Sequence, residues 1–268
     1  MFMNKILDKL VGKFFLMLQK VFNYKWTNTD YGIKEAIIFP RNIDTFNRYS
    51  ILLHHLIKNN NLNKKNTLLE IGAGGLGILN FLRKSNYDEY FDVTLFDLDE
   101  KRMLVANGEN VVIGDSNNLP FKDNSFDFVI SLDCEGLFEE QSIHEMKRAA
   151  KIGVIIHFPI DSDDGVYLGT RMDAEFQKQH VRFFNTPDEW TASALKNNYP
   201  RLDKIKKILP GANICGTENG YIWVRHMINA RRQILGYFSG LYYLFLLKRK
   251  NFVKPYRGAI ISYNKTKQ

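Results

Sequence analysis

The hydrophobic positions of the chain follow two patterns between residues 42 and 159. Short continuous apolar runs occupy residues 67–71, 93–97, 111–115, 125–131 and 153–159, and such runs are typical of buried strands. Helical spacing of apolar residues appears before the first run and again between the last two, at 42–58 and 139–150. These patterns predict successive buried strands, with helices before and between them.

Residues 1–22 carry a separate pattern, in which apolar side chains recur at helical spacing while Lys5, Lys9 and Lys13 share the other side. This predicts a basic amphipathic helix. It is not a secretory signal, because charged residues interrupt any apolar core and no small-residue cleavage site follows. Two roles fit such a helix equally: it lies on a membrane surface, or it packs over the mouth of the active site or at a homodimer contact.

A second unusual segment, residues 234–247, is apolar and rich in aromatic residues, with cationic clusters on both sides. A membrane-spanning helix needs about 20 apolar residues, so this segment is too short to span a bilayer. Its composition favours a helix in a bilayer interface first, and a buried helix or dimer contact second. Nucleic-acid binding ranks third, because stacking platforms usually sit among polar residues.

Charge is distributed unevenly along the chain. Residues 1–66, 67–165 and 166–268 carry net charges of +7, −11 and +12, which together give the total of +8. Basic flanks on an acidic centre point to a polyanionic partner, either nucleic acid or an anionic membrane, unless the flanks simply dock on the centre. The two cysteines, Cys134 and Cys215, provide neither a disulfide framework nor a metal cluster, which favours a reducing, cytoplasmic setting.

The first strand ends in a glycine-rich turn. Glu70 lies within the apolar run, and Gly72, Gly74 and Gly77 follow it, just where a helical pattern begins. Glycine lets a ligand approach the backbone closely, and a helix N-terminus offers unpaired N–H groups to an anionic group. Alone, this motif is also found in nicotinamide and flavin sites.

The next two strands each end in an acid, at Asp97 and Asp115, and the stretch LPFKDNSFDFVIS at 119–131 follows. Strands that end in carboxylates suit a ligand with several polar hydrogens, such as an amino acid, a ribose and an adenine amine. A nicotinamide-dependent oxidoreductase would share the glycine turn but would not call for the second acid and the stretch after it.

With these motifs, residues 66–158 resemble the class I S-adenosylmethionine-dependent methyltransferases. The resemblance implies a Rossmann-like, doubly wound, seven-stranded α/β sheet whose last strand, at 257–263, is antiparallel beside the fifth. N-terminal helices would precede the sheet, and 221–250 would be a helical insertion before the last strand. The implied cofactor is S-adenosyl-L-methionine, and no metal is implied.

The resemblance also assigns roles to residues of the motifs. The loop that begins at Glu70 and contains Gly72 and Gly74 would hold the methionine part of the cofactor. Asp97 would bind the ribose hydroxyls, with Leu98 beside the adenine. The adenine amine would donate to Asp115, with Ser116 next to it.

The division of the chain follows from these assignments. We predict basic N-terminal amphipathic helices at 1–65 and a cofactor-binding core at 66–165. Residues 166–268 would form a substrate and lid region that includes the insertion and the last strand. Within it, residues 165–186 show no clean period and would suit a lid over the substrate.

Three residues at strand ends are candidates for a general base: His157, Asp133 and Glu135. His157 is the first choice because an imidazole titrates near neutral pH, although a hydrogen-bonded structural histidine fits the position as well. Gly136 stands where many relatives have a histidine, and the N/D-P-P-Y tetrad of the amino-methylating group is missing. The sequence therefore favours methyl transfer to oxygen or carbon.

The predicted acceptor is a small molecule or a lipid- or glycan-linked compound, reached by a cytoplasmic protein that is peripheral to the inner face of a membrane. A homodimer is a further expectation. An RNA methyltransferase is the rival within the class. A regulatory or scaffolding protein that binds the cofactor without turnover is the alternative outside it.

Overall fold

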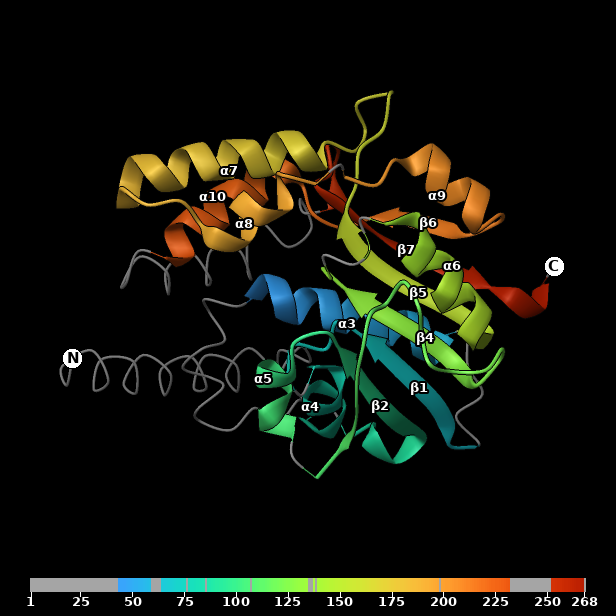
Figure 1. Ribbon diagram of the computed structural model, residues 1–268. Coiled ribbons are helices and arrows are strands. Elements are labelled where there is room, and N and C mark those ends of the chain that lie inside the picture. Colours follow the sequence, from blue (N-terminus) through green and yellow to red (C-terminus); the bar gives the residue numbers. More distant parts are fainter. Residues whose placement is uncertain are drawn as a thin grey trace, which may run out of the picture.

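The computed structural model describes residues 43–58, 64–75, 77–84, 86–106, 108–134, 137, 139–197, 199–231 and 252–267 (Figure 1). The strands are β1 (Asn66–Ile71), β2 (Phe91–Asp97), β3 (Asn110–Ile113), β4 (Phe126–Leu132), β5 (Ala150–Pro159), β6 (Asn213–Gly216) and β7 (Gly258–Asn264). The α-helices are α3 (Ile43–Lys58), α4 (Gly77–Lys84), α5 (Glu100–Met103), α6 (Glu140–Ala149), α7 (Gly169–Phe184), α8 (Glu189–Ala194), α9 (Leu202–Ile208) and α10 (Gly220–Ala230). Short 3₁₀ helices lie at Asp88–Tyr90, Leu104–Ala106 and Lys265–Lys267.

The strands form one seven-stranded sheet in the order β3-β2-β1-β4-β5-β7-β6. β1 to β5 run parallel, while β7 is antiparallel to both β5 and β6. The predicted fold is therefore confirmed, including the antiparallel last strand beside the fifth. The strand order reverses between β1 and β4, and in open α/β sheets ligands bind at the carboxyl ends of strands at such a switch point.

Helices cover both faces of the sheet (Figure 1). Successive side chains of a strand point to opposite faces. Leu68 of β1 packs in one core with side chains of α3 and α4, such as Leu56 and Ile78. Its neighbour Leu69 belongs to the opposite core, with Met146 of α6. Burial of the strands on both faces explains why they are continuous apolar runs in the sequence.

A third group of helices, α7, α8 and α10, forms a cap at one end of the sheet (Figure 1). Residues 165–186, which show no clean period in the sequence, are largely helical, because α7 spans most of them. Its buried positions include Gly169, Met172, Asp173, Phe176 and His180, which follow helical spacing. Two of the five are polar, so a search for apolar periodicity misses the helix.

Both segments singled out for membrane contact, 1–22 and 234–247, lie outside the described residues. None of the described helices is long and apolar enough to cross a bilayer. The predicted domain limits, the homodimer and the location of the protein stay predictions.

Candidate active site

The glycine-rich turn after β1 is stabilised by the buried side chain of Glu70. This carboxylate is 1% exposed. It accepts hydrogen bonds from the backbone N–H of Ile78, at 2.7 Å, and from the Tyr49 hydroxyl, at 3.3 Å. Burial raises the pKa of Glu70 from 4.5 to about 8, against the lowering effect of both hydrogen bonds and with a small further rise from Asp97. Glu70 therefore shapes the turn at the start of α4.

Gly72 is a position where the turn requires glycine. Its φ is +71°, in the left-handed region, and a Cβ there would lie 2.5 Å from Cys134 Sγ. Its N–H donates to the Phe96 carbonyl at 2.8 Å. The ends of β1, β2 and β4 therefore meet at a point with no room for a side chain on the turn.

Asp97, the last residue of β2, ties the turn to its own strand. Its Oδ2 accepts from the N–H of Gly74 at 2.8 Å, and its Oδ1 accepts from the N–H of Asp99 at 2.9 Å. Each carboxylate oxygen has a further lone pair for a ligand. Leu98, the next residue, is 74% exposed, so it presents an apolar surface beside this carboxylate.

The loop after β3 provides the opposite wall. Asp115 Oδ1 accepts from the N–H of Asn117 at 2.9 Å, and the hydroxyls of Ser116 and Ser142 lie 2.8 Å apart. The Asn117 amide donates to Glu139 Oε2 at 2.7 Å. These short contacts fix the loop with an acidic side chain at its start.

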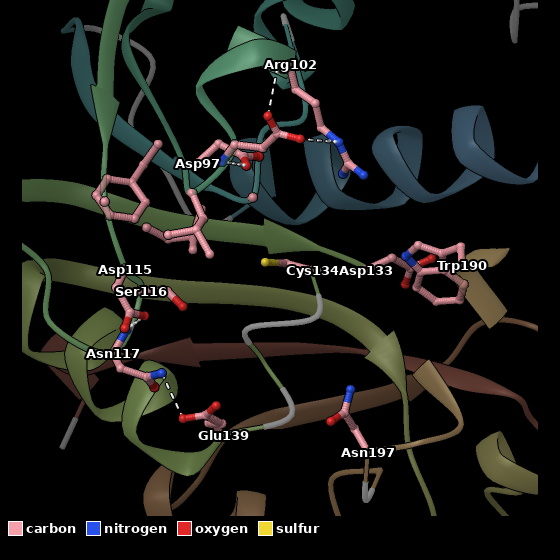
Figure 2. A pocket seen from close by; sticks show the side chains of 16 residues that line it. Asp97, Arg102, Asp115, Ser116, Asn117, Asp133, Cys134, Glu139, Trp190 and Asn197 are labelled. Carbon is pink, nitrogen blue, oxygen red and sulfur yellow. Dashed lines mark hydrogen bonds and ion pairs between the residues drawn. The ribbon is translucent and has the colours of Figure 1, made fainter. Parts of the chain in front are cut away.

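The walls enclose a cavity of about 510 Å³ (Figure 2), within the range of about 300–1,000 Å³ typical of small-molecule sites. Of the predicted site residues, six line it: Gly72, Asp97, Leu98, Asp115, Ser116 and Asp133. Glu70 and Gly74 do not line the cavity; they contribute to the site by shaping the glycine-rich turn. The sequence did not single out Arg102, Cys134, Glu139, Trp190 and Asn197, which also line it.

Trp190 and Asn197 reach the cavity from the cap (Figure 2). Trp190 lies on α8, whose N-cap is Asp188, and Asn197 follows the same helix. Neither residue sits in a motif, and only the folding of the cap over the sheet brings them to the cofactor turn. The sequence offers one weak signal, an aromatic residue in a short helix of a predicted lid.

The three candidate bases have different surroundings. Asp133, at the end of β4, lines the cavity, forms an ion pair with Arg48 and lies 3.1 Å from His157 Nδ1. His157 is fully buried, and its Nε2 lies 2.9 Å from the Thr217 hydroxyl. It therefore reaches the cavity only through Asp133. Glu135 lies outside the described residues.

A buried network of charges continues from this pair into the cap. Arg48 Nε lies 3.5 Å from Glu218, which bonds Arg257 at 2.9 Å. Arg257 Nε bonds Asp173 of α7 at 2.5 Å. Burial lowers the pKa of Arg257, but Asp173 and Glu218 outweigh burial and raise it. These ion pairs connect Asp133 to α7.

A second cavity, of about 780 Å³, adjoins the first and shares Glu139 and Asn197 with it. Its apolar lining consists of Leu137, Ile143, Leu195, Pro200, Ile205 and Ile208. Arg201 and Lys204 line its rim. A ligand in the first cavity therefore has an adjacent space with apolar walls.

The comparisons with known proteins agree with this geometry. Residues 69–158 match a protein-family model described as a methyltransferase domain. No curated protein matches the chain. In the part of the chain that the structure describes, no group of His, Cys, Asp and Glu side chains could hold a metal ion.

Solved structures of methyltransferases are similar in fold. A candidate sarcosine dimethylglycine methyltransferase from Galdieria sulphuraria superposes with a TM-score of 0.51 at 16% identity, over 87% of this chain and 88% of that one. Phosphoethanolamine N-methyltransferase 2 from Haemonchus contortus, in complex with S-adenosyl-L-methionine, gives 0.53 at 17% identity, over 88% of this chain and 58% of that one. The same enzyme with phosphomonomethylethanolamine and S-adenosylhomocysteine gives 0.51 at 18% identity, over 87% and 57%. The chain thus spans less than two thirds of the Haemonchus protein.

The chain therefore has the fold of the class I methyltransferases, and its residues 69–158 match a methyltransferase domain. The methyltransferase domain confirms the enzyme class predicted from the sequence, and the Haemonchus structures hold the predicted cofactor or its product in a similar fold. The residues present fit this cofactor. Gly72 has no side chain and lets a ligand approach the backbone, and the two carboxylates at strand ends, Asp97 and Asp115, line the same cavity.

Proposed function

We propose that the protein transfers the methyl group of S-adenosyl-L-methionine to an oxygen, or a carbon, of a small or lipid- or glycan-linked acceptor. The observation that carries this proposal is the single cavity that joins Asp97 and Asp115 at one end to Asp133 and Trp190 at the other. One end suits the cofactor, and the other leaves room for an acceptor.

At the cofactor end, each residue has a proposed task. The turn at Gly72 accommodates the methionine part, Asp97 accepts from the ribose hydroxyls, and Leu98 lies beside the adenine. Asp115 accepts from the adenine amine, with Ser116 next to it. When bound, the cofactor supplies an electrophilic methyl group on its sulfonium. Positioning of two reactants in this way can contribute about 7–11 kcal/mol to catalysis.

At the acceptor end, Asp133 is the carboxylate that faces the cavity, and we assign it the proton of an acceptor hydroxyl. His157 and Arg48 hold this carboxylate from behind. His157 is therefore a positioning residue in this proposal, in place of the direct base expected from the sequence. A general base typically contributes about 10²–10⁴-fold in rate.

The second cavity supports an acceptor with an apolar part. Its walls adjoin the first cavity at Glu139 and Asn197, so a bound molecule would extend over apolar side chains beyond the reacting atom. The first cavity is lined by five carboxylates and one cation, Arg102. Such a lining repels a phosphate backbone, which argues against RNA as the acceptor.

Calorimetric titration with S-adenosylhomocysteine tests the cofactor end. We expect Asp97→Ala to weaken binding about 10- to 100-fold, the value of one or two hydrogen bonds to a charged group. Asp92→Ala is the matched control, because Asp92 lies exposed near the start of the same strand. NADH serves as the control ligand. Tight binding of NADH in place of S-adenosylhomocysteine would overturn the proposal.

Transfer of a labelled methyl group to a panel of amphiphilic alcohols tests the acceptor end. Asp133→Asn should abolish transfer while S-adenosylhomocysteine still binds. His157→Gln should shift the pH profile of the reaction, an effect that a merely structural role would not produce. If the wild-type protein binds the cofactor product and methylates no acceptor of any class, the regulatory or scaffolding alternative is the better account.

A further inference from the structure

The outer side of the cap carries a groove between α7 and α10 that methyl transfer does not use. Successive turns of α7 line the groove with Arg171, Ala174, Glu175, Lys178 and Gln179. The helix α10 lines it with Tyr221, Val224 and Arg225. The groove has a volume of about 640 Å³. The two helices cross closely, because a Cβ at Gly220 would overlap the side chain of Met172.

Three cations surround this groove, and none of them has an ion-pair partner among the described residues. They are Arg171, Lys178 and Arg225, and all three are exposed. The one carboxylate in the groove, Glu175, accepts from the Gln179 amide at 2.8 Å. Elsewhere on the cap, by contrast, Arg231 is paired with Asp188. The groove is therefore a concentrated positive site.

Exposed apolar side chains lie in this groove and on the last turn of α7. Tyr221 is 55% exposed, and Val181 and Phe183, on the last turn of α7, are 44% and 47% exposed. Exposed tyrosine and phenylalanine next to lysine and arginine are typical of proteins that rest on a bilayer interface. A site for single-stranded nucleic acid would need several aromatic side chains on which successive bases stack, and the described lining of the groove holds one, Tyr221.

We propose that this groove binds the phosphate headgroups of an anionic membrane, so that the outer side of α7 and α10 rests on the bilayer. The net charge of +12 on residues 166–268 complements such a surface. Thr170, on the first turn of α7, lines the second cavity. A protein docked by this face would hold that cavity close to the membrane. Membrane contact itself is independent of the methyl-transfer reaction.

The experiment is flotation of the full-length protein with vesicles of phosphatidylcholine, with and without phosphatidylglycerol. The groove variant is Arg171→Gln/Lys178→Gln/Arg225→Gln. A control variant, Lys151→Gln/Lys206→Gln/Lys207→Gln, removes the same charge from exposed lysines on β5 and α9. The two variants have the same net charge. A comparison between them therefore distinguishes binding by the groove from a general electrostatic attraction to the vesicle.

We expect wild type to float only with phosphatidylglycerol. The groove variant should lose about 100-fold in vesicle affinity, while the control variant changes by a few-fold. An equal loss in the two variants, or no loss in either, overturns the proposal. So does a groove-dependent, salt-sensitive affinity for single-stranded RNA without vesicle binding. Both variants should bind S-adenosylhomocysteine as wild type does. Cofactor binding and vesicle binding are thus measured independently, and either proposal can fail without the other.

Discussion

The buried carboxyl group of Glu70 predicts that the folded protein loses stability as the pH rises through neutrality. Burial holds its pKa at about 8 in the folded chain, against 4.5 for an ordinary glutamate. Between these two values the folded chain keeps a proton that the unfolded chain has released. Unfolding therefore releases a proton in this window, and the free energy of unfolding falls as the pH increases.

The size of this effect follows from the shift. At about 1.4 kcal/mol per pKa unit, the full difference corresponds to about 5 kcal/mol. Linkage spreads the loss over the window, so between about pH 6 and about pH 9 the free energy of unfolding should decrease by roughly 3 kcal/mol from Glu70 alone. Below the unfolded pKa and above the folded pKa, this group contributes no further slope.

Chemical unfolding of wild type and Glu70→Gln at both pH values measures the effect. Glutamine keeps an acceptor for the Ile78 N–H and offers an amide N–H toward Tyr49, but it does not titrate. Subtracting the pH dependence of the free energy of unfolding of Glu70→Gln from that of wild type cancels the contribution of all other titratable groups. An exposed carboxylate, replaced in Glu100→Gln, is the control and should leave the pH dependence unchanged.

The reasoning is refuted if Glu70→Gln follows the same pH dependence as wild type. That result would mean that Glu70 is ionised in the folded protein at neutral pH, with its two donors outweighing the cost of burial. A pH dependence that disappears in Glu70→Gln alone would confirm a neutral carboxyl group under the turn.

Two further variants test the turn and the cap. Gly72→Ala should lower the midpoint of thermal unfolding more than Gly74→Ala, because both glycines have positive φ but only the first would bring a Cβ against Cys134; equal losses would contradict this. Arg257→Met should cost about 3–5 kcal/mol in chemical unfolding, because it leaves Asp173 buried without a counter-ion, and adding Asp173→Asn should recover part of the loss; a double variant less stable than the single one would disprove the pairing.

Much of the core was predictable because its signals are local. A strand buried on both faces must be apolar along its whole length, so β1 and β2 are visible as runs of sequence. The turn at Gly72 and the acid at Asp97 lie next to those runs, and a short stretch of chain fixes their positions. The class of fold and the cofactor followed from such stretches and from the resemblance that they carry.

The cap was not predictable in the same way. α7 buries Asp173 and His180 on its inner side. Asp173 is tolerated there because Arg257, from the far end of the chain, neutralises it and the Tyr199 hydroxyl donates to it. The buried polar residues interrupt the apolar period that marks most helices. Trp190 likewise joins the cavity only because α8 folds back over the sheet.

The amino-acid sequence by itself thus determined the order of strands and helices in the core, the glycine turn and the acidic strand ends. Tertiary structure alone decided that His157 is enclosed behind Asp133, and that the cap completes the cavity. The physical reason is the range of the interactions. Backbone conformation and burial of a continuous strand depend on neighbours in sequence, whereas an ion pair or a cavity wall depends on residues that only folding brings together.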